Sequence, residues 1–82
     1  MLPEIQAELE SRMLAAQQRY GAFASTHEAL GVATEEWDEL RDAVRANDLA
    51  AVGRECIDLA AVLVRLACVL RESEGTRARS VK

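Results

Sequence analysis

Residues 49–71 read LAAVGRECIDLAAVLVRLACVLR, and their pattern of apolar residues indicates how the chain packs. On an α-helix, at about 100° per residue, its large apolar residues fall on one stripe. Other apolar residues widen this stripe, and only a narrow strip that includes Asp58 and Arg65 is polar. A helix that is apolar nearly all round must be buried on more than one side. We therefore expect this helix to pack within its own chain on one side and against a second copy on the other. The residues of the main stripe are Val52, Leu59, Leu63, Leu66 and Leu70.

The preceding sequence predicts two more helices and no strand. Apolar residues follow the helical period over about 3–20, until Gly21 interrupts it. Ser25 with Glu28 three residues later has the form of a capping box, which predicts a second helix over about 26–46. The apolar stripe of this second helix, which we take as its core face, is Leu30, Ala33, Trp37, Leu40 and Val44.

Asn47 and Asp48 mark the turn between the second and third helices. Asn47 can close one helix and Asp48 can cap the next. So short a turn makes the two helices antiparallel neighbours. We therefore predict an all-α domain over residues 1–72, in which three main helices per chain assemble into four-helix-bundle-type cores through oligomerisation. The polar, aperiodic segment 73–82 is expected to be a flexible C-terminal tail.

Composition narrows the classes of partner. Half of the 82 residues are hydrophobic and 29% are charged, which favours a folded chain over a disordered one. The net charge is −4 and no basic stripe occurs, so we expect no nucleic-acid partner and no membrane partner. No segment is apolar and long enough to cross a bilayer, and the start lacks the pattern of a signal peptide.

The two cysteines indicate a reducing compartment. Cys56 and Cys68 are twelve residues apart on the predicted third helix, which separates them by about 18 Å. A disulfide tolerates no more than about 7 Å between Cα atoms. We interpret both as small core residues and expect a cytoplasmic protein.

Four acidic residues predict a metal site. Glu36 and Glu39 are three residues apart, as are Glu55 and Asp58, and this spacing places each pair on one helix face. Glu55 falls inside the apolar face, where an unpaired carboxylate costs several kcal/mol unless it is neutralised. Carboxylate oxygens suit Mg²⁺ or Mn²⁺, and with such an ion we expect chemistry on phosphate. The alternative is a solvated helix face with charge pairs along the helix.

The order of these acids resembles the signature of a known enzyme family. Glu-Glu-x-x-Glu at 35–39, then fifteen residues, then Glu-x-x-Asp at 55–58 resembles the MazG-like nucleoside triphosphate pyrophosphohydrolases, of the all-α NTP pyrophosphatase group. The segments 20–28 and 48–58 also resemble small members, so the resemblance covers about 19–70. It implies Mg²⁺-dependent hydrolysis of a nucleoside triphosphate, or its deoxy form, to the monophosphate and pyrophosphate. It also implies a homodimer or a homotetramer built as a dimer of dimers.

The resemblance assigns roles residue by residue. The acid that precedes the metal ligands, Glu35, would be an outer acid beside them or the base for the attacking water, and these alternatives stay open. The implied catalytic residues are Glu35, Glu36 and Glu39. The implied metal ligands are Glu36, Glu39, Glu55 and Asp58.

A second set of residues concerns contacts with the substrate. Larger family members carry a further helix with basic residues that contact the phosphates and the base, and 73–82 has no comparable pattern. Phosphate contacts would then come from other arginines or from a neighbouring subunit. Trp37 could stack on a base, although packing is the favoured interpretation. The arginines available are Arg19, Arg41, Arg54 and Arg65, and the substrate-binding set that we predict is Arg19, Tyr20, Phe23 and Arg54.

Two functional classes follow from the sequence. The first is a nucleotide pyrophosphohydrolase that clears or balances nucleotide pools. The second is a non-catalytic helical oligomer, a regulatory or interaction module with the same fold. Within enzymes, the related phosphoribosyl-ATP pyrophosphohydrolases fit less well, because their usual residues around the acids are not matched.

Overall fold

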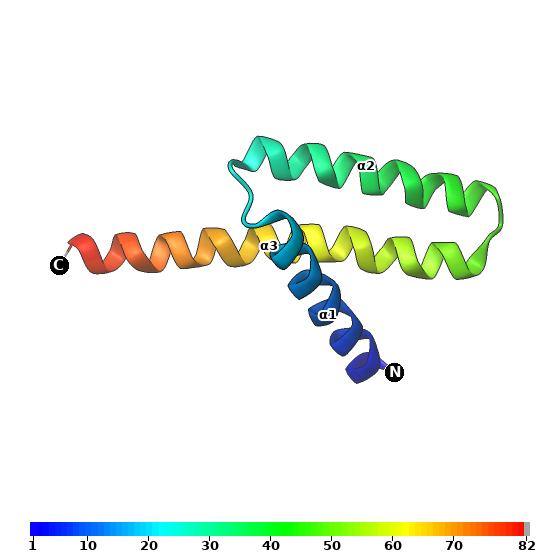
Figure 1. The fold of residues 1–82 in the computed structure, drawn as a ribbon, viewed down its shortest axis with the longest axis horizontal. Coiled ribbons are helices and arrows are strands. Elements are labelled where there is room, and N and C mark those ends of the chain that lie inside the picture. Colours follow the sequence, from blue (N-terminus) through cyan, green and yellow to red (C-terminus); the bar gives the residue numbers. More distant parts are fainter. Residues whose placement is uncertain (82) are drawn as a thin grey trace.

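The computed structural model of this protein describes residues 1–81, and the side chains of residues 1–73. It contains three helices, α1 (Leu2–Tyr20), α2 (Thr26–Arg45) and α3 (Leu49–Val81), with no strand in the described range. α3 packs against both other helices, α2 runs antiparallel to it, and α1 crosses it obliquely (Figure 1). Within these residues no helix has the length and apolarity to cross a bilayer. The predicted all-α class is confirmed.

The start of α2 follows from its local sequence. The Glu28 backbone N–H donates to the Ser25 hydroxyl oxygen at 3.1 Å. The Glu28 carboxylate in turn accepts from the Ala24 backbone N–H at 3.3 Å. The predicted capping box is confirmed, with its return bond one residue earlier than in the standard motif.

The turn between α2 and α3 is also set locally. Asn47 has a φ of 55°, in the left-handed region that asparagine tolerates better than most residues. The Asp48 carboxylate accepts from the Ala51 backbone N–H at 3.1 Å and so caps α3. The predicted antiparallel pairing of α2 and α3 follows from this turn.

α3 is longer than predicted. The sequence pattern ends it near Arg71, whereas the helix continues to Val81. Residues 72–81 contain no proline to end the helix, and half of them (Glu, Ala and Arg) favour it. At about 1.5 Å per residue, 33 residues span about 50 Å, and Figure 1 shows α3 extending past α1 and α2. Side chains from residue 74 onward lie outside those described, so the flexible tail over 73–82 stays a prediction.

Small side chains form the core between α2 and α3. Alanine at a helix contact lets two backbones approach closely, and α2 meets α3 in this way. The predicted core stripe of α2 is therefore only partly right, since Trp37 is 54% exposed in the single chain and Leu30 and Val44 are exposed too. The buried apolar residues are Ala29, Ala33 and Ala43 of α2 and Ile57, Ala61 and Val62 of α3.

Seven of the exposed apolar residues of α2 and α3 lie in two rows, which we call the outer rows. Residues seven apart share a helix face, and both rows have this spacing. A groove of about 440 Å³ lies between the two helices, where Trp37 and Val44 face Val52 and Cys56. Both cysteines are exposed, so their predicted core position is wrong for the single chain. The outer rows are Leu30, Trp37 and Val44 on α2, and Leu49, Cys56, Leu63 and Leu70 on α3.

Candidate active site

Three carboxylates meet between α2 and α3, and we call them the acid cluster: Glu36, Glu39 and Glu55. One carboxylate oxygen from each residue lies within 4.8 Å of those of the other two. Glu36 and Glu55 are half-buried, and Glu39 is exposed. Since the α2–α3 turn is short, Glu55, about one-fifth of the way along α3, lies opposite the second half of α2. The structure thus brings together three of the four predicted metal ligands.

The acid cluster is electrostatically unfavourable when its carboxylates from α2 and α3 are ionised together. The Oε2 atoms of Glu36 and Glu55 are both buried, and neither has a hydrogen-bond partner among the described residues. Burial, with the negative charges of Glu39 and Asp58, raises the pKa of Glu36 from 4.5 to about 7. Burial, with the neighbouring Glu39 carboxylate, also raises the pKa of Glu55. The cluster therefore favours an added proton or an added cation.

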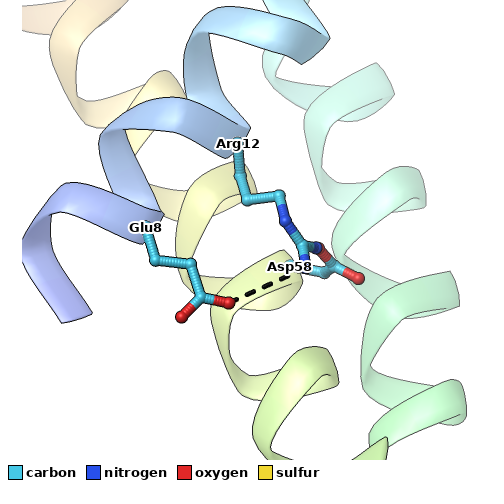
Figure 2. A network of polar contacts seen from close by, with 3 residues as sticks. All are labelled: Glu8, Arg12 and Asp58. Atoms are coloured by element: carbon cyan, nitrogen blue, oxygen red, sulfur yellow. Dashed lines mark hydrogen bonds and ion pairs between the residues drawn. The ribbon is translucent and has the colours of Figure 1, made fainter. Parts of the chain in front are cut away.

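The fourth predicted ligand, Asp58, is paired with a residue of α1. Arg12 Nη1 donates to Asp58 Oδ1 in a short contact, and Arg12 Nη2 lies 3.8 Å from Glu8 Oε1. Figure 2 shows Arg12 reaching from α1 to Asp58 on α3. Sequence reasoning missed Arg12, because its partner is 46 residues away and the spacing of Glu8 and Arg12 is that of an ordinary surface pair.

A cavity of about 420 Å³ adjoins the acid cluster, bounded by α1, the connection 21–25, α2 and α3. Its volume lies within the range of small-molecule sites. Glu36 and Asp58 line it, and so does the exposed Glu35. Tyr20 and Phe23, two of the predicted substrate-binding residues, also line it.

The other two predicted substrate-binding residues lie away from this cavity. Arg19 is exposed, with its Cζ 5.3 Å from the centroid of the Tyr20 ring. Arg54 is exposed one helical turn before Asp58, toward the α2–α3 turn. Neither lines the cavity, whereas Arg12 and Arg65 do.

Arg65 joins α3 to the connection between α1 and α2. Its Nη2 donates to the Gly21 carbonyl oxygen at 3.0 Å, and its Cζ lies 4.4 Å from the centroid of the Phe23 ring. Gly21 has a φ of 75°, which glycine adopts without strain and which ends α1. Periodicity places Arg65 in the polar strip of α3, yet α1 and this connection cover the strip at that point, so the side chain is buried.

No protein-family model matches this sequence, and neither the curated proteins nor the solved structures include a match. The resemblance to the MazG-like family therefore rests on the residues quoted above.

Proposed function

We propose that this protein is a Mg²⁺-dependent nucleoside triphosphate pyrophosphohydrolase of the MazG-like type. It would hydrolyse a nucleoside or deoxynucleoside triphosphate to the monophosphate and pyrophosphate. The observation that carries the proposal is the acid cluster, in which three carboxylates from two helices lie within 4.8 Å of one another beside a cavity. The spacing of the acids along the sequence supports the same function.

The residues present fit a hard divalent cation. All donors of the acid cluster are carboxylate oxygens, which Mg²⁺ and Mn²⁺ prefer. The buried Oε2 atoms of Glu36 and Glu55 have no hydrogen-bond partner, so both retain their capacity to bind a cation. Asp58 would complete the set of metal ligands once it releases Arg12 and binds the cation instead. When bound, Mg²⁺ neutralises the charge of the triphosphate and lowers the pKa of a water.

The remaining chemistry belongs to side chains around the cavity. Glu35 is exposed at the cavity wall, where its carboxylate can accept a proton from the attacking water. Attack on the α-phosphorus then breaks the bond to the bridging oxygen, and pyrophosphate leaves. Tyr20 and Phe23 offer rings that can contact the base.

The assembly that we propose is a homodimer or a dimer of dimers formed through the outer rows. Two rows with seven-residue spacing match the seam of a helical bundle. The groove between them is walled by apolar side chains such as Trp37, Val44 and Val52. Packing a second copy there would remove this surface from water, which is the dominant favourable term in protein association.

A pyrophosphate assay tests the proposed function. The protein is incubated with Mg²⁺ and a panel of nucleoside and deoxynucleoside triphosphates, and the released pyrophosphate and monophosphate are measured. Glu36→Gln and Asp58→Asn should each lower the rate about 100-fold or more, whereas Glu10→Gln, an exposed acid on α1, should not. If no nucleotide is hydrolysed and Mg²⁺ leaves the melting temperature unchanged, the hydrolase proposal fails and the non-catalytic module is favoured.

A further inference from the structure

Arg65 is a buried cation without a carboxylate partner. Its side chain is only 8% exposed, and none of the ion pairs among the described side chains involves it. Nη2 donates to the Gly21 carbonyl oxygen, but the buried Nε has no acceptor in the part of the chain that the structure describes. A buried charge without a counterion is unfavourable, so this guanidinium has unused capacity for an anion.

The position of Arg65 indicates where that anion would lie. The side chain lines the same cavity as Glu36 and Asp58. The Gly21 carbonyl and the Phe23 ring, 4.4 Å from Cζ, hold the plane of the guanidinium. Arg12 also lines the cavity, but Asp58 and Glu8 already neutralise its charge.

The chemistry of the cavity favours a phosphate group that enters together with a cation. A held guanidinium plane suits the oxygens of a phosphate better than a single point charge does. The cavity is also lined by acids, which would repel a free anion unless a divalent cation accompanied it. These acids are Glu28, Glu35, Glu36 and Asp58.

We propose that Arg65 is the phosphate-binding residue of this cavity. It contacts the diphosphate portion of the substrate, the part that leaves as pyrophosphate, while the acid cluster holds the cation. The inference rests on the proposed function for the identity of the anion. It selects Arg65 from the four arginines available for phosphate contacts, in place of Arg19 and Arg54 of the predicted substrate-binding set.

The first test uses the wild-type protein and inorganic pyrophosphate. The Nε–H signals of the arginine side chains are followed by ¹⁵N NMR in saturating Mg²⁺ while pyrophosphate is added, with Mg²⁺ alone as the reference. The Arg65 signal should shift and saturate, and that of the exposed Arg71 on the same helix should stay in place. Absence of saturable binding, binding that leaves the Arg65 signal unchanged, or an equal shift with the dicarboxylate malonate would each overturn the proposal.

Matched variants separate binding from support of the fold. Arg65→Met should weaken pyrophosphate binding at least tenfold, Arg65→Lys should weaken it less, and Arg71→Met should leave it unchanged. If Arg65 only held the Gly21 carbonyl, Arg65→Met would lower the melting temperature without changing pyrophosphate affinity, which would refute phosphate binding. If Arg65→Met does not fold, the wild-type titration decides.

The two proposals fail in distinguishable ways. If the protein hydrolyses a nucleotide but its Arg65 signal does not shift with pyrophosphate, only the phosphate-binding role of Arg65 is refuted. If the Arg65 signal shifts and saturates but no nucleotide is hydrolysed, the phosphate-binding site is supported and the hydrolase proposal fails.

Discussion

Beside its buried apolar residues, the inner face of the α2–α3 pair holds a cluster of carboxylates, whereas the outer face exposes large apolar side chains. On the inner face, the acid cluster brings three carboxylates within 4.8 Å, two of them with buried oxygens that lack partners. On the outer face, the outer rows expose large apolar side chains, with Trp37 54% exposed. Folded proteins usually bury apolar groups and keep unpaired charges in water. Each face is therefore less favourable in the isolated chain than it would be with a cation inside and a second copy outside.

Placing a charge in the outer rows should change the behaviour of the protein more than any other substitution described below. Leu63→Glu should weaken self-association by about 3 kcal/mol or more, which is over about 100-fold in the dissociation constant. Light scattering at micromolar concentration should then give the mass of one chain, whereas the wild type should give the mass of two or four chains.

Leu14→Glu is the matched control, because Leu14 is exposed on α1 outside the outer rows. A wild type that stays monomeric at these concentrations would contradict the proposed assembly.

The inner face can be tested by pH in the absence of divalent cations. The pKa of Glu36 is about 7 in the folded chain and about 4.5 when unfolded, so the folded state holds this proton more tightly between the two values. The stabilisation is complete below about pH 4.5 and is lost as the pH rises to about 7. Urea unfolding in EDTA should show a free energy of unfolding lower by about 2 kcal/mol at pH 8 than at pH 5, after allowance for partial solvent screening.

Glu36→Gln should flatten this dependence, and Mg²⁺ should restore wild-type stability more at pH 8 than at pH 5. A free energy of unfolding that rises from pH 5 to pH 8 in EDTA would mean that the acid cluster is not strained.

Removing one inward charge should stabilise the metal-free protein. Glu55→Leu replaces a half-buried carboxylate by an apolar side chain, and we expect it to raise the free energy of unfolding in EDTA by about 1 to 2 kcal/mol at pH 8. It should also abolish the stabilisation by Mg²⁺. Glu10→Leu, at an exposed position of α1, should do neither. A loss of stability in EDTA would count against an inward-facing Glu55.

The smallest effect concerns the contact of α1 with Asp58, the predicted metal ligand outside the acid cluster. Arg12→Met leaves Asp58 without its partner, which should lower the stability of the metal-free protein by about 1 kcal/mol. Because Asp58 is then free to bind a cation, Mg²⁺ affinity measured by calorimetry should rise. Glu8→Gln removes only the 3.8 Å contact and should change neither quantity measurably. Unchanged Mg²⁺ affinity in Arg12→Met would show that Asp58 stays apart from the cation.

Features determined within a few residues were predictable from the sequence. Ser25 and Glu28 predict the start of α2, and Asn47 and Asp48 predict the α2–α3 turn, because each pair acts on the backbone beside it. The inward position of Glu55 followed from helical period alone.

Features that depend on α1 were not predictable in the same way. Periodicity places a residue on a helix face but does not say which other element covers that face, so the burial of Arg65 was missed. The partner of Asp58 depends on where α1 crosses α3, and no local signal marks Arg12. The choice of core on α2 was partly wrong for a related reason. Bulky Trp37 was preferred to small residues such as Ala29 and Ala43, whereas close packing of two helices selects the small ones.

The turn at Asn47 and Asp48 also bears on the order of folding. This turn joins α2 and α3, so contacts between the two helices are local in the sequence. Local contacts form faster than contacts between residues far apart in the chain. The contact of Arg12 with Asp58 spans 46 positions and closes a much longer loop. We therefore expect the acid cluster to form before α1 docks and before Arg12 pairs with Asp58. Divalent ions in a refolding buffer should then speed the folding step itself, as stabilisation of a nucleus does, besides slowing the unfolding step.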